Sequence, residues 1–575
     1  MIKVMRYLKP YKWWAILVIG LTFVQALSQL YLPALMADIV DKGVVGQDIS
    51  FIIQTGLVML GFTIIVSICT ILARLFASKT AVGFARDLRR DIFVHVEQYS
   101  MYEFDQIGTS SLITRSTNDV TQIQNVMVLI LTMLIMAPIM AIGGVIMALS
   151  TDTNLSWIIV AVIIALGGLI GIIASKGIPL FKVIQKKLDR VNLVLRESLT
   201  GIRVIRAFNK EDFEDVRFEK ANKDLTATSI KVYRIMSAMF PALMLIMNIT
   251  TVAIVWFGSQ RVDAGAMQVG DMMAFQQYVM QIMFSLMMAA MLFVMIPRAS
   301  ASAERINEIL DMEHEINDIE NPVSANKKRG YVEFKDVTFS YKGAEEAVLK
   351  NINFKANPGE TTAIIGSTGS GKSTLINLIT RFYDITKGKV LVDGVDVKDQ
   401  LRSDLRSKIG LVPQKISLFS GTIKENILYG KDDASDKEID FAIKTAQADE
   451  FISELEKGTT SNVEQGGANY SGGQRQRLSI ARAIIRKPEI YIFDDSFSAL
   501  DFKTDAELRK ALKEETEKAT VFIVAQRVST VMNADQIIVL DQGEIVGKGK
   551  HKELINSCDV YKEIVSSQLS EEELS

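Results

Sequence analysis

The sequence predicts a multidomain fold in which a transmembrane domain of six helices precedes an α/β domain of the P-loop type. Six long apolar runs fill the first half of the 575 residues. In the second half, a glycine-rich loop lies between a short apolar run and a helical pattern. Asn, Pro, Ser and Lys replace the apolar pattern between the halves. We therefore expect a transmembrane domain over 1–318, a linker over 319–330 and a P-loop domain over 331–575.

Six apolar segments are each long enough to cross a bilayer, which takes about 20 helical residues. The segments are Trp13–Met36, Phe51–Phe76, Val126–Leu149, Leu155–Ala174, Met236–Gly258 and Met272–Ile296. No small-residue cleavage site follows the first segment convincingly, so we expect a membrane span rather than a cleaved signal peptide. The lipid bilayer is therefore an expected partner of this chain.

Charged residues are distributed unevenly between the spans. The connections after the second and fourth spans are long and basic, with Lys79, Arg86, Arg89, Arg90 and with Lys176, Lys182, Lys186, Lys187, Arg190. The other connections are short and carry Asp38, Asp41, Asp48, Asp152 and Asp263. Because basic loops stay on the cytoplasmic side, we expect both termini in the cytoplasm. The apolar spacing of Lys182–Arg206 predicts a helical stalk; a helix lying on the bilayer surface is the alternative.

A phosphate-binding loop follows the short apolar run 362–365. It consists of Gly366, Ser367, Thr368, Gly369, Ser370, Gly371, Lys372, Ser373 and Thr374. Its glycines let backbone N–H groups turn toward phosphate oxygens, and the helix that follows adds the positive end of its dipole. We expect Lys372 to bind the β- and γ-phosphates of a nucleotide and the Ser373 hydroxyl to be a ligand of Mg²⁺.

Residues 331–570 resemble the ABC ATPase family in several further motifs. The run Ser471, Gly472, Gly473, Gln474 is the signature of that family and the most specific motif in the chain. The resemblance also places Tyr341 against adenine, Gln414 in the Q-loop, Asp494 at the end of the Walker B strand and Asp501 in the D-loop. It implies ATP and Mg²⁺ as cofactors, with Ser373, Gln414 and Asp494 at the metal. The candidate ATP-binding residues are then the nine residues of the phosphate-binding loop, the four signature residues, Tyr341, Gln414 and Asp501.

The first half is similar to the membrane domain of ABC exporters in the runs Ser111–Asp119 and Glu197–Phe208. The resemblance implies short coupling helices that dock into ATPase domains, near Thr109–Asn118 and near Asn209–Glu214. In that family, two nucleotide domains enclose two ATP molecules, and each signature meets the ATP held by the other domain. One such domain occurs here, so the resemblance implies a second half-transporter chain.

Two residues depart from the family pattern. Asp495 stands where the family has a glutamate that orients or deprotonates the attacking water, and Gln526 stands where it has a histidine. Aspartate is one methylene shorter, and glutamine carries no charge. With Lys372, these residues form an expected catalytic set that binds ATP and hydrolyses it poorly. The pattern resembles the degenerate-site subunit of bacterial heterodimeric multidrug ABC exporters, which implies a plasma-membrane location and a partner bearing the usual glutamate and histidine.

The remaining composition gives no sign of another kind of site. The net charge of −2 predicts no nucleic-acid binding. Neither the two cysteines nor the three histidines have the spacing of metal ligands; they are Cys69, Cys558, His95, His314 and His551.

Methionines crowd the last two spans. They are Met236, Met239, Met244, Met247, Met272, Met273, Met280, Met283, Met287, Met288, Met291 and Met295. Gln277 and Gln281 lie one helical turn apart and share a face with part of this stripe. Because methionine is flexible and polarisable, the stripe favours a surface for varied hydrophobic or amphipathic small molecules. Helix packing and lipid contact explain it equally well.

Three other functions use the same motifs. A lipid or lipid-linked flippase and a peptide exporter have the same architecture. A regulatory subunit that binds ATP without hydrolysing it fits the two departures, whereas the intact signature and Q-loop argue against it. The six spans exclude a soluble DNA-repair ATPase, and importers commonly divide the two domains between chains.

Overall fold

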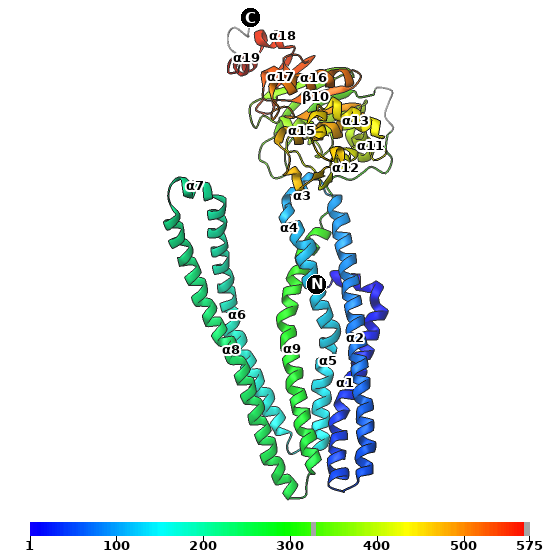
Figure 1. Cartoon of the computed structure of the whole chain (residues 1–575), viewed down its shortest axis with the longest axis vertical. Helices are drawn as coiled ribbons and strands as arrows, with labels where there is room; N and C mark the ends of the chain where they lie inside the picture. Colours follow the sequence, from blue (N-terminus) through cyan, green and yellow to red (C-terminus); the bar gives the residue numbers. More distant parts are fainter. Residues whose placement is uncertain (324–328, 569–575) are drawn as a thin grey trace. The chain divides into compact units, whose positions relative to one another are not determined.

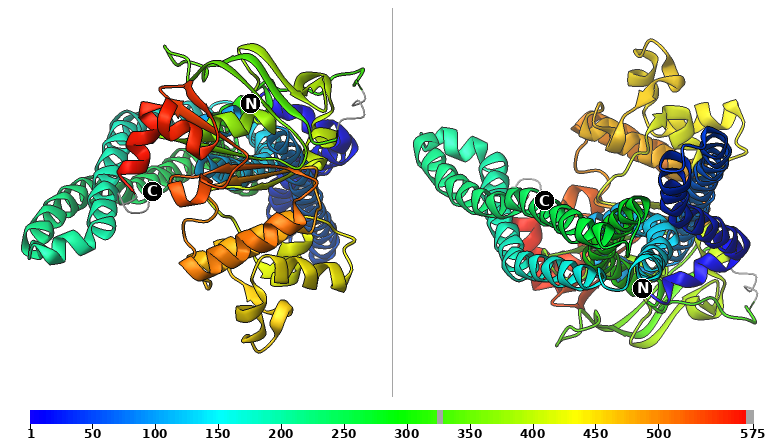
Figure 2. Two further views of the ribbon diagram at one scale, coloured as in Figure 1. Left: turned by 90° about the horizontal axis from the view of Figure 1, so that it is seen from above. Right: turned by 90° about the horizontal axis from the view of Figure 1, so that it is seen from below.

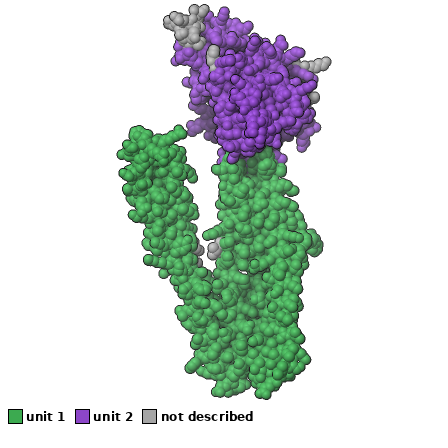
Figure 3. Space-filling model, viewed as in Figure 1, with its two compact units in different colours: residues 1–97, 109–312 green, residues 98–108, 313–575 purple. Residues whose placement is uncertain are grey.

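The computed structural model describes residues 1–323 and 329–568. Figure 1 traces the chain, and Figure 3 colours its two compact units. The membrane unit comprises 1–97 and 109–312, and the α/β unit comprises 98–108 together with the chain from 313 onward. Part of the expected linker 319–330, namely 324–328, lies outside the described residues. The domain limits expected from the sequence remain a prediction.

The membrane unit holds six helices that are long and apolar enough to cross a bilayer, so the six-span prediction is confirmed. These helices are α1 (Lys12–Asp38), α2 (Ile49–Glu97), α5 (Val120–Thr151), α6 (Trp157–Thr200), α8 (Glu211–Asp263) and α9 (Val269–Leu310). The shorter elements of this unit are η1 (Val4–Tyr11), which precedes α1, and η2 (Ile39–Val44), α4 (Thr109–Thr114), η3 (Arg115–Asp119) and α7 (Ile202–Ala207), which lie between the long helices.

Four of the six helices are far longer than a bilayer requires. At 1.5 Å per residue, the 49 residues of α2 extend roughly 74 Å, against about 30 Å of hydrocarbon. The helical structure predicted for Lys182–Arg206 is confirmed, because α6 and α7 cover nearly all of it, and α2 likewise continues through the basic connection after the second span. Helices α6 and α8 lie side by side in every view and are joined at their far end by α7 (Figures 1 and 2).

The methionine stripe is divided between packing and exposure. Met283 is buried in a cluster with Tyr278 and Phe275, and Met272 packs against that cluster. Met291 is exposed, as is Met273 near the start of α9. Packing accounts for part of the stripe, and the surface for small molecules stays a prediction.

Among the described residues, the α/β unit contains a four-stranded sheet, a six-stranded sheet and a small two-stranded sheet formed by β7 (Gly421–Thr422) and β8 (Asn462–Val463). The other strands of the unit are β1 (Val332–Phe339), β2 (Leu349–Ala356), β3 (Thr361–Gly366), β4 (Lys387–Val392), β5 (Val395–Asp396), β6 (Ile409–Val412), β9 (Ile490–Asp494), β10 (Thr520–Val524), β11 (Gln536–Asp541) and β12 (Glu544–Gly549). The four-stranded sheet has the order β2-β1-β4-β5 and is antiparallel. The six-stranded sheet has the order β12-β11-β3-β10-β9-β6 and is parallel except for β12.

Helices cover these sheets. They are α10 (Lys372–Ile379), α11 (Arg402–Ser407), α12 (Ile423–Leu428), α13 (Asp436–Thr445), α14 (Asp449–Ser453), α15 (Gly472–Ile484), α16 (Phe502–Glu515), α17 (Val528–Val531), α18 (His551–Ser557) and α19 (Asp559–Ser566). Leu375 of α10 packs with Ile364, Phe522 and Phe354 in a core between the two sheets. The strands β3, β9 and β10 are covered on both faces of their sheet. Their sequences are therefore almost continuously apolar instead of alternating between apolar and polar residues.

One short helix from the first half of the sequence belongs to the α/β unit. Helix α3 (Met101–Ile107) carries the buried Glu103, whose carboxylate accepts hydrogen bonds from the N–H groups of Ser100 at 2.5 Å and Glu315 at 2.7 Å. Lys342 Nζ lies 5.2 Å from the centroid of the Tyr102 ring. The segment that packs with the α/β unit is therefore 98–108, immediately before the coupling segment expected near Thr109–Asn118.

Glu103→Ala should release α3 from the α/β unit. The substitution removes the acceptor of two hydrogen bonds from a side chain that is only 2% exposed, at a cost of about 2–3 kcal/mol. We expect faster amide hydrogen exchange over 98–108, measured by mass spectrometry, with the six-stranded sheet unchanged. Gln106→Ala, at an exposed position of the same helix, is the matched control. Equal exchange in both variants would contradict the role of Glu103.

Candidate ATP-binding site

The phosphate loop connects β3 to α10 and lies against β11. An added Cβ at Gly366 would lie 2.1 Å from the carbonyl oxygen of Leu540, so only glycine allows this approach. Lys372 Nζ donates to the carbonyl oxygens of Gly366 at 2.8 Å and Ser367 at 2.7 Å, which holds the ammonium group over the loop. Burial lowers the pKa of Lys372, and the carboxylates of Asp494 and Asp495 oppose that shift.

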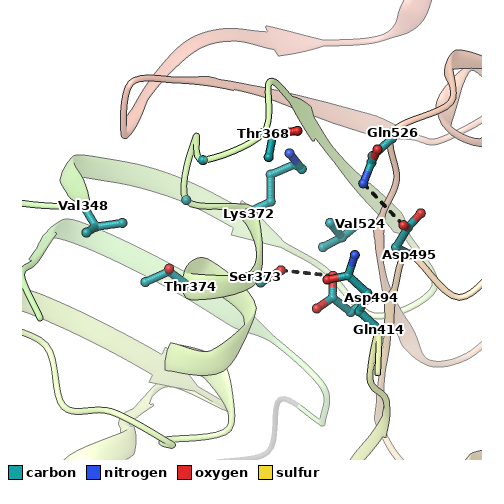
Figure 4. Close-up of a pocket in the computed structure, with 12 residues that line it drawn as sticks. Val348, Thr368, Lys372, Ser373, Thr374, Gln414, Asp494, Asp495, Val524 and Gln526 are labelled. Carbon is teal, nitrogen blue, oxygen red and sulfur yellow. Dashed lines mark hydrogen bonds between the residues drawn. The ribbon is translucent and has the colours of Figure 1, made fainter. Parts of the chain in front are cut away.

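A cavity of about 340 Å³ opens beside this loop (Figure 4). It is lined by Val348, Thr368, Gly369, Gly371, Lys372, Ser373, Thr374, Gln414, Asp494, Asp495, Val524 and Gln526. The structure thus brings the predicted catalytic set, the predicted metal ligands and much of the phosphate loop to one place. This convergence follows from the sheet, because β3, β10 and β9 are parallel neighbours and their carboxyl ends meet at one edge.

The predicted metal ligands lie on adjoining elements at this edge. Asp494 ends β9, and its Oδ1 accepts a hydrogen bond from Ser373 Oγ at 3.4 Å. Gln414 follows β6 and lies beside Asp494 in Figure 4. Burial is the main cause that raises the pKa of Asp494, and the negative charge of Asp495 raises this pKa further. The hydrogen bond from Ser373 lowers the pKa of Asp494 but does not cancel the increase.

Asp495 has an unusual backbone conformation for its position. Its φ of +47° lies in the left-handed region, where Asp and Asn are tolerated better than longer side chains. Its carbonyl oxygen accepts hydrogen bonds from Ser498 Oγ at 3.0 Å and Gln476 Nε2 at 3.4 Å, so the signature helix α15 helps to hold this turn. Burial raises the pKa of Asp495, and a hydrogen bond from Gln414 lowers it.

Gln526 lies two residues beyond β10 and faces Asp495 (Figure 4). Its Nε2 lies 3.4 Å from Asp495 Oδ2, a long hydrogen bond. The two departures from the family pattern are therefore direct neighbours in space, although 30 residues separate them in the sequence.

The signature residues lie outside this cavity. Ser471 caps helix α15: its Oγ accepts from the N–H of Gln474 at 3.2 Å, and the Gln474 side chain accepts from the N–H of Ser471 at 2.9 Å. Gly472 and Gly473 begin the helix. Asp501 likewise caps α16, where it accepts from the N–H of Thr504 at 2.9 Å.

Tyr341 lies at the border of the site. The strand β1 ends at Phe339, two residues before Tyr341. Its hydroxyl is 3.0 Å from Thr374 Oγ1, and its ring meets Tyr383 edge to face with centroids 5.2 Å apart. Both contacts fix the ring beside α10.

Two apolar residues that line the cavity, Val348 and Val524, were not predicted from the sequence. Val348 precedes β2, and Val524 ends β10. Neither belongs to a motif; only their place next to strands that border the phosphate loop could have indicated them.

The comparisons with known proteins assign the family. A family model described as the ABC transporter transmembrane region matches residues 15–286, and one described as ABC transporter matches residues 349–498. An uncharacterized ABC transporter ATP-binding protein of Mycobacterium tuberculosis is 43% identical over 567 residues, which cover 98% of this chain and 97% of that protein. The chain belongs to the ABC transporter family.

Other members of the family resemble this transporter over nearly its whole length. The ATP-dependent lipid A-core flippase of Desulfotalea psychrophila is 32% identical over 540 residues, 93% of each chain. The solved structure of a bacterial Atm1-family ABC exporter with ATP bound aligns with a TM-score of 0.79 and 25% identity, over 99% of both chains. This chain is therefore a half-transporter of an ATP-driven exporter, and its α/β unit is an ATPase domain. The predicted fold class is confirmed.

The residues of the cavity fit ATP with Mg²⁺. Asp494, Ser373 and Gln414 supply oxygen atoms, the ligands that Mg²⁺ prefers. In the described part of the chain, no group of three or more His, Cys, Asp or Glu side chains could hold a metal ion. A site of three mixed oxygen donors needs the phosphates of the nucleotide to complete it.

Asp494→Asn should stabilise the ligand-free protein and abolish its stabilisation by Mg·ATP. Because burial raises the pKa of Asp494, its charged form destabilises the fold at neutral pH, and this cost disappears as the pH falls below the ordinary value of 3.8. The neutral amide removes the cost, and we expect Tm to rise by about 2 °C.

Scanning fluorimetry with and without Mg·ATP measures both effects, since a ligand stabilises the state that binds it. Asp541→Asn, at the end of β11 in the same sheet, is the control and should keep the Mg·ATP shift. A full Mg·ATP shift in Asp494→Asn would contradict a metal-binding role for Asp494.

Proposed function

We propose that this chain is the degenerate-site half of a heterodimeric exporter of hydrophobic or amphipathic compounds. The cavity on its phosphate loop binds ATP and Mg²⁺ and hydrolyses ATP slowly, while its signature completes a competent site on the partner. The observation that carries the proposal is the pairing of Asp495 with Gln526 inside the ATP cavity of a chain whose signature is intact.

Two features of the pair support slow hydrolysis. A general base must reach to within about 2.6–3.2 Å of its proton, and a misplacement near 1 Å costs on the order of 100-fold. The Asp495 side chain is one methylene shorter than glutamate, and it starts from a left-handed backbone position held by α15. Gln526 can donate a hydrogen bond to Asp495, but it cannot carry charge. The site can therefore bind ATP with Lys372 and the loop and still lack a well-placed base.

The placement of the signature supports a second subunit. Ser471 and Gly472 are exposed and do not line the cavity, so they are free to approach an ATP held by another chain. The N-terminus of the 13-residue helix α15 offers N–H groups and a positive dipole end to that γ-phosphate. The partner then carries the family's glutamate and histidine.

Apolar side chains at the end of the α6–α8 hairpin support the same assembly. Phe208 is 71% exposed and Phe213 is 65% exposed, beside the exposed Val204 of α7. Exposed apolar groups of this kind mark protein interfaces. We place the second coupling helix here, near Asn209–Glu214, and propose that the ATPase domain of the partner covers it.

The substrate class rests on the membrane helices. Methionines on α9 are divided between the core and exposed positions, so Met273 and Met291 can meet a varied apolar cargo. The basic connections formed by α2 and α6 stay on the cytoplasmic side of a bacterial membrane, so both termini lie in the cytoplasm as well. Lipid export is the second candidate, because a relative of this chain is a lipid A-core flippase. Peptide export and a non-hydrolysing regulatory role remain further alternatives.

The pair Asp495→Glu and Gln526→His should raise the rate of ATP hydrolysis by the purified chain by about tenfold or more. The longer acid reaches the water, and the imidazole restores its link to the γ-phosphate. Turnover in lipid nanodiscs measures the gain, with Lys372→Ala in the same background as the inactive control. An unmodified chain that already hydrolyses ATP at the rate of the double variant would refute the degenerate site.

Ser471→Ala should reduce ATP turnover and transport by the heterodimer more than Asp495→Asn does. The serine serves the fast site on the partner, whereas the aspartate serves the slow site on this chain. The half-transporter that co-purifies from native membranes supplies the partner, and uptake of a fluorescent amphipathic dye into inverted vesicles measures transport. A larger loss from Asp495→Asn would overturn the assigned division between the sites.

A further inference from the structure

Gln568 binds the backbone on both sides of Arg527, next to the catalytic cavity. Its Nε2 donates to the carbonyl oxygen of Gln526 at 2.8 Å, and its Oε1 accepts from the N–H of Val528 at 2.8 Å. The side-chain amide of Gln568 thus forms one hydrogen bond with its nitrogen and one with its oxygen, both to the backbone of the segment 526–528. Gln568 lies just beyond α19, far from every motif of the ATP site in the sequence.

The contact satisfies a backbone group that has no local partner. Val528 begins α17, and the first N–H groups of a helix cannot bond within it. Arg527, which precedes α17, contributes no side-chain cap. Gln568 supplies the missing acceptor, and with its second atom it also fixes the peptide that carries Gln526.

A packed base holds Gln568 in place. Tyr561 and Val565 of α19 are buried in one cluster with Ala525 and Val528. The Tyr561 hydroxyl lies 2.7 Å from His551 Nδ1 of α18. The helices α18 and α19 are therefore packed against the segment that carries Gln526, and Gln568 follows just after them.

We propose that Gln568 is a positioning residue that sets the distance between Gln526 and Asp495. The amide fixes the backbone of Gln526, whose side chain reaches Asp495 Oδ2 at 3.4 Å. The C-terminal end of the chain thereby controls the alignment of the slow ATP site. This inference rests on the proposed part of Gln526 and Asp495 in hydrolysis.

The test uses the full chain in nanodiscs with radiolabelled ATP in single turnover. Gln568→Ala should lower the hydrolysis rate constant about fivefold to tenfold, because Gln526 loses its fixed backbone. Half-saturation by ATP should stay within about twofold, since the phosphate loop is untouched. Ser567→Ala is the matched control, because within 1–323 and 329–568 its hydroxyl donates only to Ile564 O, at 2.8 Å.

Gln568→Glu separates the two contacts of the amide. Its carboxylate still accepts from Val528 N–H but can no longer donate to Gln526. We expect amide exchange at Val528 to stay slow in this variant and to become faster in Gln568→Ala, while hydrolysis slows in both. A normal hydrolysis rate in Gln568→Glu would show that the amide only caps α17 and would overturn the positioning role.

A double-mutant cycle provides the decisive comparison. In a Gln526→Ala background, Gln568→Ala should have little further effect on the rate, because the side chain that it positions is gone. Additive losses would overturn the proposal. A chain with Asp495→Asn that keeps its full single-turnover rate would instead refute the proposed role of Asp495, which is a failure of the proposed function. Loss of rate in Asp495→Asn without loss in Gln568→Ala would refute the inference about Gln568 alone.

Discussion

The parallel pairing of β3, β10 and β9 is the constraint on which the ATP site depends. The register aligns Val524 with Ile364 on one side and with Asp494 on the other. The phosphate loop, the acidic pair and Gln526 therefore leave the sheet at one edge. A shift of one residue in β10 would turn its side chains to the other face and separate Gln526 from Asp495.

Much of this arrangement could be predicted from the sequence. Some features depend only on residues that are close together in the sequence, and these could be predicted from one chain. They are the glycines of the phosphate loop, the apolar run before Asp494 and the serine at the start of α15. Long apolar runs likewise fix the membrane helices, because a bilayer leaves the backbone no other partner.

Features that depend on distant contacts could not be predicted. Glu103 draws α3 into the α/β unit through the N–H of Glu315, which lies 212 positions further on. Val348 reaches the cavity only because β2 lies beside the loop. Gln568 belongs to no motif, and its importance comes from two peptide groups that fold next to it. The left-handed turn at Asp495 is also invisible in the sequence, although it favours aspartate over a longer acid at that position.

The membership of 98–108 in the α/β unit changes how the chain is threaded. The backbone passes between the two units three times, after Glu97, after Gly108 and after Met312, instead of once through the linker. A body held by one flexible tether can spin freely about it, whereas three attachment points resist twisting. A cut within 319–330 falls inside the α/β unit, so it would leave all three crossings intact, and the ATPase domain beyond the cut would be held to the rest of the chain only by noncovalent contacts, such as the one between Lys342 and Tyr102.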